Sequence, residues 1–211
     1  ASDAVRAAAE EAVALAAGRA LREPVSVHQV VRVPSSSPGR PPAQEVAVAD
    51  LTPQVSALVE ASGLQEGTVT VISRHTTTAI TINEWESRLV EDVAEWLLRL
   101  APPDDRSDKG SPGRGVQYRH NDIHLRPDSA DERQRCRDNG WDIDDASELE
   151  RWRAQEPINA HSHLLCMMLG SSESIPVTGG RLAIGEWQSI MLVDVDGPRD
   201  RTVGLQVVGF K

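Results

Sequence analysis

The sequence predicts an α+β fold, in which a mixed β-sheet packs with helices in a single compact domain. Three observations support this. Strand-like and helix-like segments follow one another without the regular βαβα order of a doubly wound sheet. The length of 211 residues suits one well-packed domain. Hydrophobic residues make up 39% and charged residues 26% of the chain, values typical of globular proteins.

The first elements are a helix and two strands. Residues 1–24 are expected to form an N-terminal helical arm, because alanine dominates this stretch and Pro24 ends it. The domain itself is expected to span residues 25–211. Val25–Val33 is rich in β-branched residues and partly alternates, so it should be a strand, with Glu45–Leu51 as its hairpin or sheet partner.

Two helices follow, separated by strands. Thr52–Ser62 fits a helix with Thr52 as its N-cap and Gly63 as its stop. Glu84–Leu100 is strongly amphipathic, because its large apolar residues recur every three or four positions, so it should pack on a core. Asn83 would cap it. The intervening strands are expected at Thr68–Ser73 and Ala79–Ile82.

The second half of the chain begins with polar segments. A loop is expected at 101–115, followed by a charged insertion at about 123–156 that has little periodicity before a short helix from Ser147 to Trp152. The apolar stretch Ala160–Leu169 should end at Gly170. Three further strands are expected at Ser174–Val177, Ser189–Asp194 and Thr202–Val208.

Composition narrows the classes of function. The formal net charge of −10 disfavours nucleic acid as a partner, while a local basic site for a small anion remains compatible with it. No apolar run approaches the roughly 20 residues that cross a bilayer. Ala12–Ala17 is a poor secretory signal, so a cytoplasmic location without membrane contact is expected. Cys136 and Cys166 lack the paired spacing of a zinc ribbon or a thioredoxin-type site.

Two polar clusters adjoin the predicted central strands. In His75-Thr76-Thr77-Thr78, a histidine at the end of a buried strand could point into a cleft, where the neighbouring hydroxyls would bind an anion. The simpler explanation is that threonines favour strands. Helix capping explains Asn83-Glu84 completely, and the functional alternative is that Glu84 faces the same cleft as His75.

Three more clusters follow. His120 and His124 would share one face of a helix, which suits a metal, although a solvated loop also explains His124. His161 and His163 share a side only in an extended chain, so at most one should serve a site. Trp187 and Gln188 could supply an apolar wall and an amide, or Trp187 could simply lie in the core.

Taken in order, these clusters resemble the YjbQ-like family, also called the secondary thiamine-phosphate synthase family. The resemblance runs from about Val25 to the C-terminus. This sequence departs from the family pattern at Glu186, where threonine is more usual, and in the length of the segment 123–156. The carrying motifs are His75–Ala79, Thr81–Glu84, Tyr118–Asn121, Asn159–His163, Leu169-Gly170, Gly180–Ile190 and Asp196–Arg201.

The resemblance implies a homotrimer with a polar cleft in which His75, His120 and His163 converge. Three imidazoles with an open fourth position would suit zinc, and they would equally suit a phosphate. By motif position, the catalytic residues would be His75, Glu84, His120 and His163, and the substrate-binding residues Thr76, Thr77, Asn83, Trp187, Gln188 and Arg201.

The family name implies a thiamine-phosphate synthase, which joins hydroxymethylpyrimidine diphosphate to thiazole phosphate and releases pyrophosphate. The substrate would be a phosphorylated small molecule, magnesium could accompany the diphosphate, and no nucleotide or flavin is expected. Two alternatives remain open. One is a metal-dependent hydrolase or lyase with Glu84 as general base. The other is a non-catalytic trimeric protein that binds a small anion.

Overall fold

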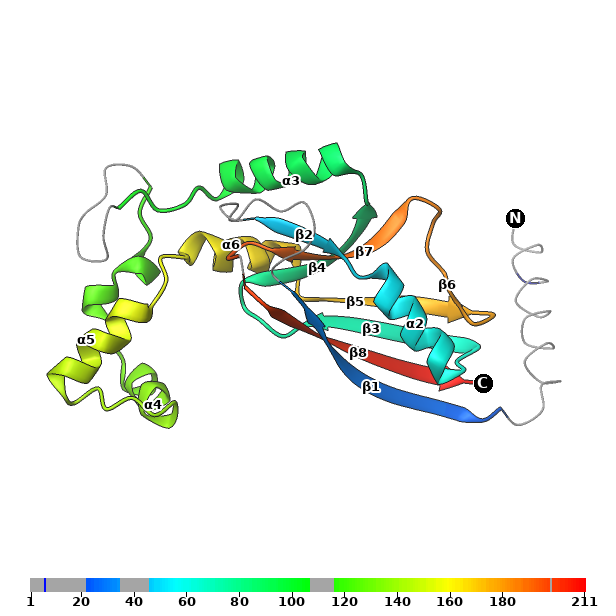
Figure 1. Cartoon of the computed structure of the whole chain (residues 1–211), viewed down its shortest axis with the longest axis horizontal. Coiled ribbons are helices and arrows are strands. Elements are labelled where there is room, and N and C mark those ends of the chain that lie inside the picture. The colour runs from blue at the N-terminus through cyan, green and yellow to red at the C-terminus, as the bar shows by residue number, and fades with distance from the viewer. Residues whose placement is uncertain (1–5, 7–21, 35–45, 107–115, 198) are drawn as a thin grey trace.

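The computed structural model describes Arg6 and residues 22–34, 46–106, 116–197 and 199–211. The predicted N-terminal arm lies outside these residues except for Arg6 and residues 22–24, and so does most of the predicted loop at 101–115. In the described residues, the strands form two antiparallel sheets and the α-helices number five (Figure 1). The α+β prediction is confirmed, with two antiparallel sheets in place of one mixed sheet.

The larger sheet has the strand order β1-β8-β3-β5-β6 and the smaller one β2-β7-β4. β1 pairs with β8 and β2 pairs with β7, so the prediction that these first two strands pair with each other is wrong. The larger sheet comprises β1 (Pro24–Val33), β3 (Glu66–Ser73), β5 (Ser172–Thr178), β6 (Arg181–Leu182) and β8 (Arg201–Phe210). The smaller sheet comprises β2 (Ala47–Asp50), β4 (Thr78–Glu84) and β7 (Gln188–Asp194).

The main core lies between the two sheets and is completed by helix α2 (Thr52–Ser62). Because side chains alternate along a strand, every second residue of β3, β4, β7 and β8 points into it. α2 ends at Gly63 as predicted, in the left-handed conformation with φ 72°. Thr52 does not cap the helix. Its hydroxyl accepts the backbone N–H of Ile190 at 2.9 Å and so joins α2 to β7.

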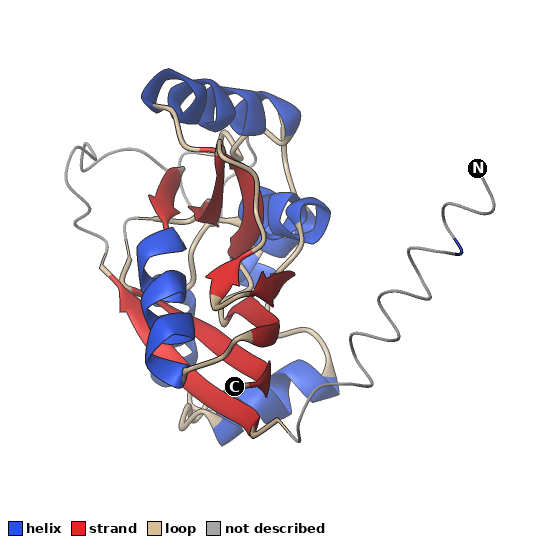
Figure 2. Ribbon diagram, turned by 90° about the vertical axis from the view of Figure 1, so that its right-hand side faces the viewer, coloured by secondary structure: helices blue, strands red, loops and turns tan. Residues whose placement is uncertain are grey.

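A second core covers the opposite face of the smaller sheet, against α6 (Ala160–Leu169) and α3 (Ser87–Leu100). Figure 2 shows α3 lying outside the strand layers. Leu97 is the buried residue of α3, whereas Trp96 is 53% exposed and Leu100 45%. Much of the apolar face that was predicted to pack on a core is therefore open to solvent in a single chain.

The start of α3 differs from the prediction. Asn83 and Glu84 are the last residues of β4, where they pair with Ser189 and Gln188 of β7. The N-cap is Glu86, whose carboxylate accepts the backbone N–H of Arg88 at 3.0 Å and of Leu89 at 2.8 Å. Asn83 therefore does not cap the helix, because pairing with β7 extends the strand through it.

The charged insertion forms a pair of helices that projects from the sheets (Figure 1). α4 (Ala130–Asp138) was not predicted, because its polar sequence has no clear apolar period. α5 (Ala146–Gln155) is longer than predicted and is capped by Asp145. Two short 3-10 helices, η1 (Arg119–Asn121) and η2 (Ile123–Leu125), precede them. No described helix combines the length and apolar composition that a bilayer crossing requires.

Candidate functional site

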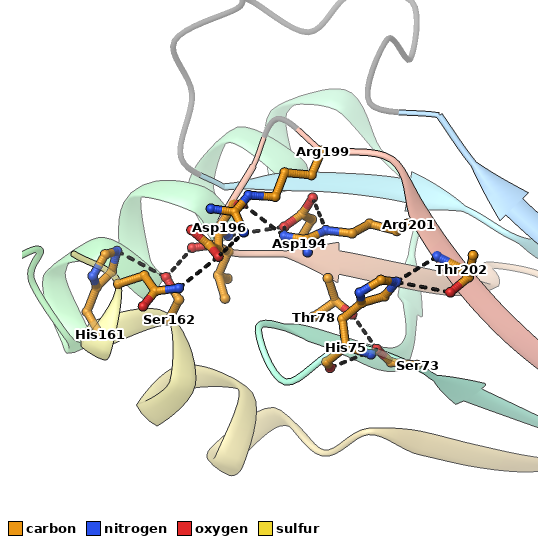
Figure 3. Close-up of polar contacts among 12 residues, drawn as sticks. Ser73, His75, Thr78, His161, Ser162, Asp194, Asp196, Arg199, Arg201 and Thr202 are labelled. Carbon is orange, nitrogen blue, oxygen red and sulfur yellow. Dashed lines mark hydrogen bonds and ion pairs between the residues drawn. The ribbon is translucent and has the colours of Figure 1, made fainter. Parts of the chain in front are cut away.

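One end of the main core is polar. Along the inward-facing positions of four strands, the apolar side chains give way to Ser73, Thr78, Asp194 and Arg201, all of which are buried. Thr78 lies opposite Asp194 in the pairing of β4 with β7, and the hydroxyls of Ser73 and Thr78 contact each other. We call these four residues, together with the β3–β4 loop at 74–77, the polar end (Figure 3).

Arg201 and Asp194 form a buried, two-pronged ion pair. The guanidinium donates from Nε to Oδ2 at 2.9 Å and from Nη2 to Oδ1 at 2.6 Å, and both side chains are about 5% exposed or less. Nη2 also donates to the carbonyl of Asp196 at 2.9 Å. Nε and Nη2, the two nitrogens that would bind an anion side by side, therefore already donate to acceptors of the protein itself.

His75 lies in the loop between β3 and β4. Its Nε2 accepts the backbone N–H of Thr202 at 2.9 Å, so that nitrogen carries no proton and the neutral ring holds its proton on Nδ1. Burial, and next the positive charge of Arg201, lower the pKa of His75 below its ordinary value of 6.5. The ring is thus kept neutral, with Nδ1–H as a hydrogen-bond donor.

The threonines beside His75 differ in access. Thr76 is exposed, whereas Thr77 is 5% exposed and its carbonyl accepts the backbone N–H of Val195 at 3.2 Å. The exposed Arg74, which was not selected from the sequence, precedes His75 in the same loop. Arg74, His75 and Thr76 thus place a cation, a ring donor and a hydroxyl together on one short loop.

His120 and His163 meet at a second position. Their rings lie 4.9 Å apart between centroids and at 72° to each other, with His120 on η1 and His163 on α6. Burial lowers the pKa of both rings, and the charge of Arg126 lowers each further. The carboxylate of Asp196 opposes this shift at His163. The pair is therefore predominantly neutral near pH 7.

Asn121 holds the two histidine-bearing elements together. It is fully buried, its Oδ1 accepts the backbone N–H of Ala160 at 3.0 Å, and its Nδ2 donates to Asp104 at 3.1 Å. Burial alone would raise the pKa of Asp104, but hydrogen bonds from Arg106, Asn121 and Tyr118 outweigh it and lower the pKa to about 2. η1 is thus anchored both to α6 and to the segment that follows α3.

A metal site of three imidazoles does not form within one chain. Among the described residues, which include His75, His120 and His163, no group of three or more histidine, cysteine, aspartate or glutamate side chains could hold a metal ion. Two of the three rings meet, while His75 is engaged by Thr202 at the polar end. The convergence of all three, which the resemblance implies for a homotrimer, therefore stays a prediction for the assembled protein.

The other two histidines of these motifs have separate environments. His124 lies on η2 and is exposed, so its ring does not share a helical face with His120. His161 is 4% exposed on α6, with its Nε2 3.3 Å from the hydroxyl of Ser162. As expected for a helix, His161 and His163 diverge, and only His163 reaches His120.

The remaining predicted site residues lie at the opposite end of the smaller sheet. Six residue steps separate Thr78 from Glu84 along β4, which is about 20 Å of extended chain. Glu84 pairs with Gln188, whose Oε1 accepts the backbone N–H of Gly185 at 2.7 Å. Trp187 is 72% exposed, so it does not lie in the core. In one chain, Asn83, Glu84, Trp187 and Gln188 are therefore separated from His75.

Several residues at the polar end and beside the His120–His163 pair were not selected from the sequence. Asp194 carried a detectable signal, since a carboxylate ends the apolar run Ile190–Val193 and must find a partner when buried. Asn121 and Asp196 carried none beyond their place in the family motifs, because their contacts join segments far apart in the chain. Asn159 illustrates this, as its Nδ2 donates to Asp196 Oδ2 at 2.9 Å.

Comparison with known proteins gives a consistent result. A family model described as UPF0047 protein YjbQ-like matches residues 41–210. A UPF0047 protein of Methanothermobacter thermautotrophicus is 34% identical over 166 residues, covering 79% of this chain and 85% of that protein. A UPF0047 protein of Archaeoglobus fulgidus is 34% identical over 161 residues, covering 76% of this chain and 90% of that protein.

Solved structures give the same family and the same fold. A hypothetical protein of Aeropyrum pernix K1 matches with a TM-score of 0.60 and 30% identity, over 87% of this chain and 98% of that one. A YbjQ-like protein of unknown function from Sulfolobus solfataricus matches with a TM-score of 0.59 and 26% identity, over 89% and 99%. The predicted family and fold are confirmed, and the names of these relatives carry no activity.

Proposed function

The chain belongs to the YjbQ-like family of UPF0047 proteins, and on that premise we propose that it is a small-molecule enzyme whose polar end binds a phosphorylated substrate. The arrangement of His75 carries this proposal. Its Nε2 accepts a backbone N–H, so the neutral ring offers a donor and cannot ligate a metal through that nitrogen. Arg74 and Thr76 flank it with a guanidinium and a hydroxyl, which are groups that bind phosphate oxygens.

The reaction we propose is the one that the family resemblance implies, in which hydroxymethylpyrimidine diphosphate condenses with thiazole phosphate. The departing pyrophosphate gathers negative charge, and donors arranged before the reaction stabilise it most effectively. Arg74 and the Nδ1–H of His75 would do so here, while the hydrogen bonds that the loop makes with Thr202 and Val195 keep it in place. Magnesium, where it takes part, would arrive on the diphosphate oxygens.

Two measurements test this proposal. Steady-state rates with both substrates are compared between the wild type and His75→Ala, and phosphate binding is measured by calorimetry for the same pair. We expect both to fall at least tenfold, since a donor to a charged group is lost. His124→Ala, which removes an exposed histidine elsewhere, is the matched control. Equal rates in wild type and His75→Ala would end the synthase proposal, and binding without turnover would favour the non-catalytic alternative.

The alternative of a metal-dependent hydrolase or lyase is supported by the contact between His120 and His163. Two neutral imidazoles 4.9 Å apart can supply two ligands of a zinc ion. The remaining ligands would come from outside the described residues of one chain, for example from a second chain, because none among those residues completes the set. Elemental analysis of purified protein distinguishes the cases. Stoichiometric zinc that His163→Ala abolishes would favour this alternative over the synthase.

The homotrimer is likewise a proposal. Exposed apolar side chains on α3 and α6 support self-association, since large apolar patches on a surface commonly mark interfaces. Within one chain Glu84 and Trp187 are separated from His75, so a site that contains all three would need these two residues from a neighbouring copy. A sedimentation mass three times that of the chain is expected, and a monomer at all accessible concentrations would refute the trimer. The exposed residues are Trp96, Leu100, Leu164, Met167 and Met168.

A further inference from the structure

The inserted helix pair lies between His120 and His163 in the chain. It comprises residues 126–156, which we call the α4–α5 unit, and it begins shortly after His120 and ends shortly before His163. The buried apolar residues Cys136, Ile143 and Trp152 form a cluster separate from the two cores of the sheets. Because the described residues of the unit share no apolar core with the sheets, polar contacts near the ends of the unit must largely fix its position against the histidines.

Arg126 makes most of these contacts. Its Nε donates to Glu132 of α4 at 2.8 Å, and its Nη2 lies 3.3 Å from Glu156, just after α5. The guanidinium also lies 5.5 Å from the ring centroid of Trp152 in the cluster of the unit. Its backbone carbonyl accepts Nε of Arg153 at 2.9 Å. Arg126 alone therefore contacts α4, the residue that follows α5, and the apolar cluster of the unit.

The ion pairs of Arg126 are less exposed to solvent than an ordinary surface ion pair. The side chains of Arg126 and Glu132 are each 17% exposed, whereas those of the Arg137–Asp144 pair in the same unit are 40% and 66% exposed. Water and salt therefore screen the Arg126 contacts less. The planar guanidinium can serve several acceptors at once, which a lysine ammonium on its flexible stem does less well.

The third nitrogen of the Arg126 guanidinium contacts the backbone of His120. Nη1 donates to the backbone carbonyl of His120 at 3.3 Å, at the end of η1 where carbonyls lack a helical partner. The imidazole of His120 in turn packs edge-on against His163 of α6. The contact therefore ties the α4–α5 unit to the element that presents His120.

We propose that Arg126 is a positioning residue, which uses the α4–α5 unit as a brace to hold His120 against His163. This role rests on the proposed function only because both histidines belong to the candidate site. It can be tested without measuring turnover, because it concerns the contact between two rings. Its failure is therefore distinguishable from failure of the proposed activity, which His75→Ala tests separately.

The test is nuclear magnetic resonance of histidine-labelled protein, with the nuclear Overhauser contact between the two rings as the readout. The chain has six histidines, so single substitutions suffice to assign the ring signals. Arg126→Gln removes the contacts, and Arg126→Lys keeps the charge but not the planar fork. Arg137→Gln, which breaks an exposed pair of the same unit, is the matched control. The methyl signals of Ile143 report whether the unit stays folded.

We expect the ring contact to weaken by more than half in both Arg126 variants and to persist in Arg137→Gln. Arg126→Lys should keep the Ile143 signals in place, so it decides the matter if Arg126→Gln unfolds the unit. A ring contact of wild-type strength in Arg126→Lys would overturn the proposal, since charge alone would then suffice. An equal loss in Arg137→Gln would also overturn it, since the effect would not be specific to Arg126.

Discussion

At the scale of single residues, the ion pair with Asp194 determines which groups the guanidinium of Arg201 can bind. A guanidinium near a predicted anion site could bind either a ligand or a carboxylate of the protein, and here it binds Asp194 through two donors. Ion pairs this deeply buried add little net stability compared with apolar residues, but breaking one is costly because a charge is left without a partner. Arg201 is therefore held inside the protein by Asp194 and by the carbonyl of Asp196.

This buried pair leads to a prediction about stability. Asp194→Asn should lower the free energy of unfolding by about 3–5 kcal/mol, because it leaves the charge of Arg201 uncompensated in the core. Asp144→Asn breaks the exposed pair with Arg137 and should cost at most about 1 kcal/mol. Urea unfolding of both variants checks this, and similar losses in the two would contradict the assignment of a buried, coupled pair.

His75 leads to a prediction about pH. Its pKa in the folded protein lies below 6.5, first because of burial and then because of Arg201. Between the two pKa values the unfolded chain binds a proton that the folded ring does not. This contribution to stability is therefore full above pH 6.5 and is lost as the pH falls through the folded-state pKa.

The measurement compares unfolding of the wild type with that of His75→Gln from about pH 7.5 to 5.5. The wild type should lose stability more steeply on acidification. His120 and His163 also have lowered pKa values, but they are present in both proteins and cancel in the comparison. Parallel curves would show that the ring of His75 is not held neutral by the fold.

At the scale of elements, the segment after α3 is anchored by Asp104. Its side chain is fully buried beside Arg106, which also donates to Asp122 at 2.8 Å. Asn121 completes the link to α6. The position of His120 thus depends on a polar network spanning residues 104–160.

Asp104→Asn should lower the free energy of unfolding by about 2 kcal/mol at neutral pH, because the pKa of this carboxyl falls from 3.8 to about 2 on folding. The contribution is present above pH 3.8 and is lost as the pH falls through about 2. The difference between wild type and variant should therefore shrink over that interval in urea titrations. Asp92→Asn, at an exposed position on α3, is the control. A difference that does not change with pH would rule out this linkage.

At the scale of the whole molecule, the open faces of α3 and α6 and the division of the predicted site between two ends of a sheet both favour association. Replacing Trp96 and Met167 by serine removes exposed apolar surface without touching either buried cluster. We expect this double variant to sediment at a lower mass than the wild type while keeping its circular dichroism spectrum. An unchanged mass would place the interface elsewhere.

The sequence alone was enough to predict the α+β class, the family and most of the elements. Apolar periodicity and β-branched runs are local properties, so α2, α6 and the strands β3, β4, β7 and β8 fell close to where they were predicted. The predictions that failed depended on distant partners. The extension of β4 through Asn83 needs β7, and the strand that β1 pairs with cannot be read from its own residues.

The same distinction applies to the site. The sequence by itself marked the polar clusters that contain His75, His120 and His163, because side-chain chemistry is local, and the resemblance to the family selected these three histidines from them. Only the tertiary structure determined that His120 meets His163 and that His75 accepts a hydrogen bond from Thr202. These contacts join positions 43 and 127 residues apart in the chain. Such distances are set by how the sheets pack, which no short stretch of sequence specifies.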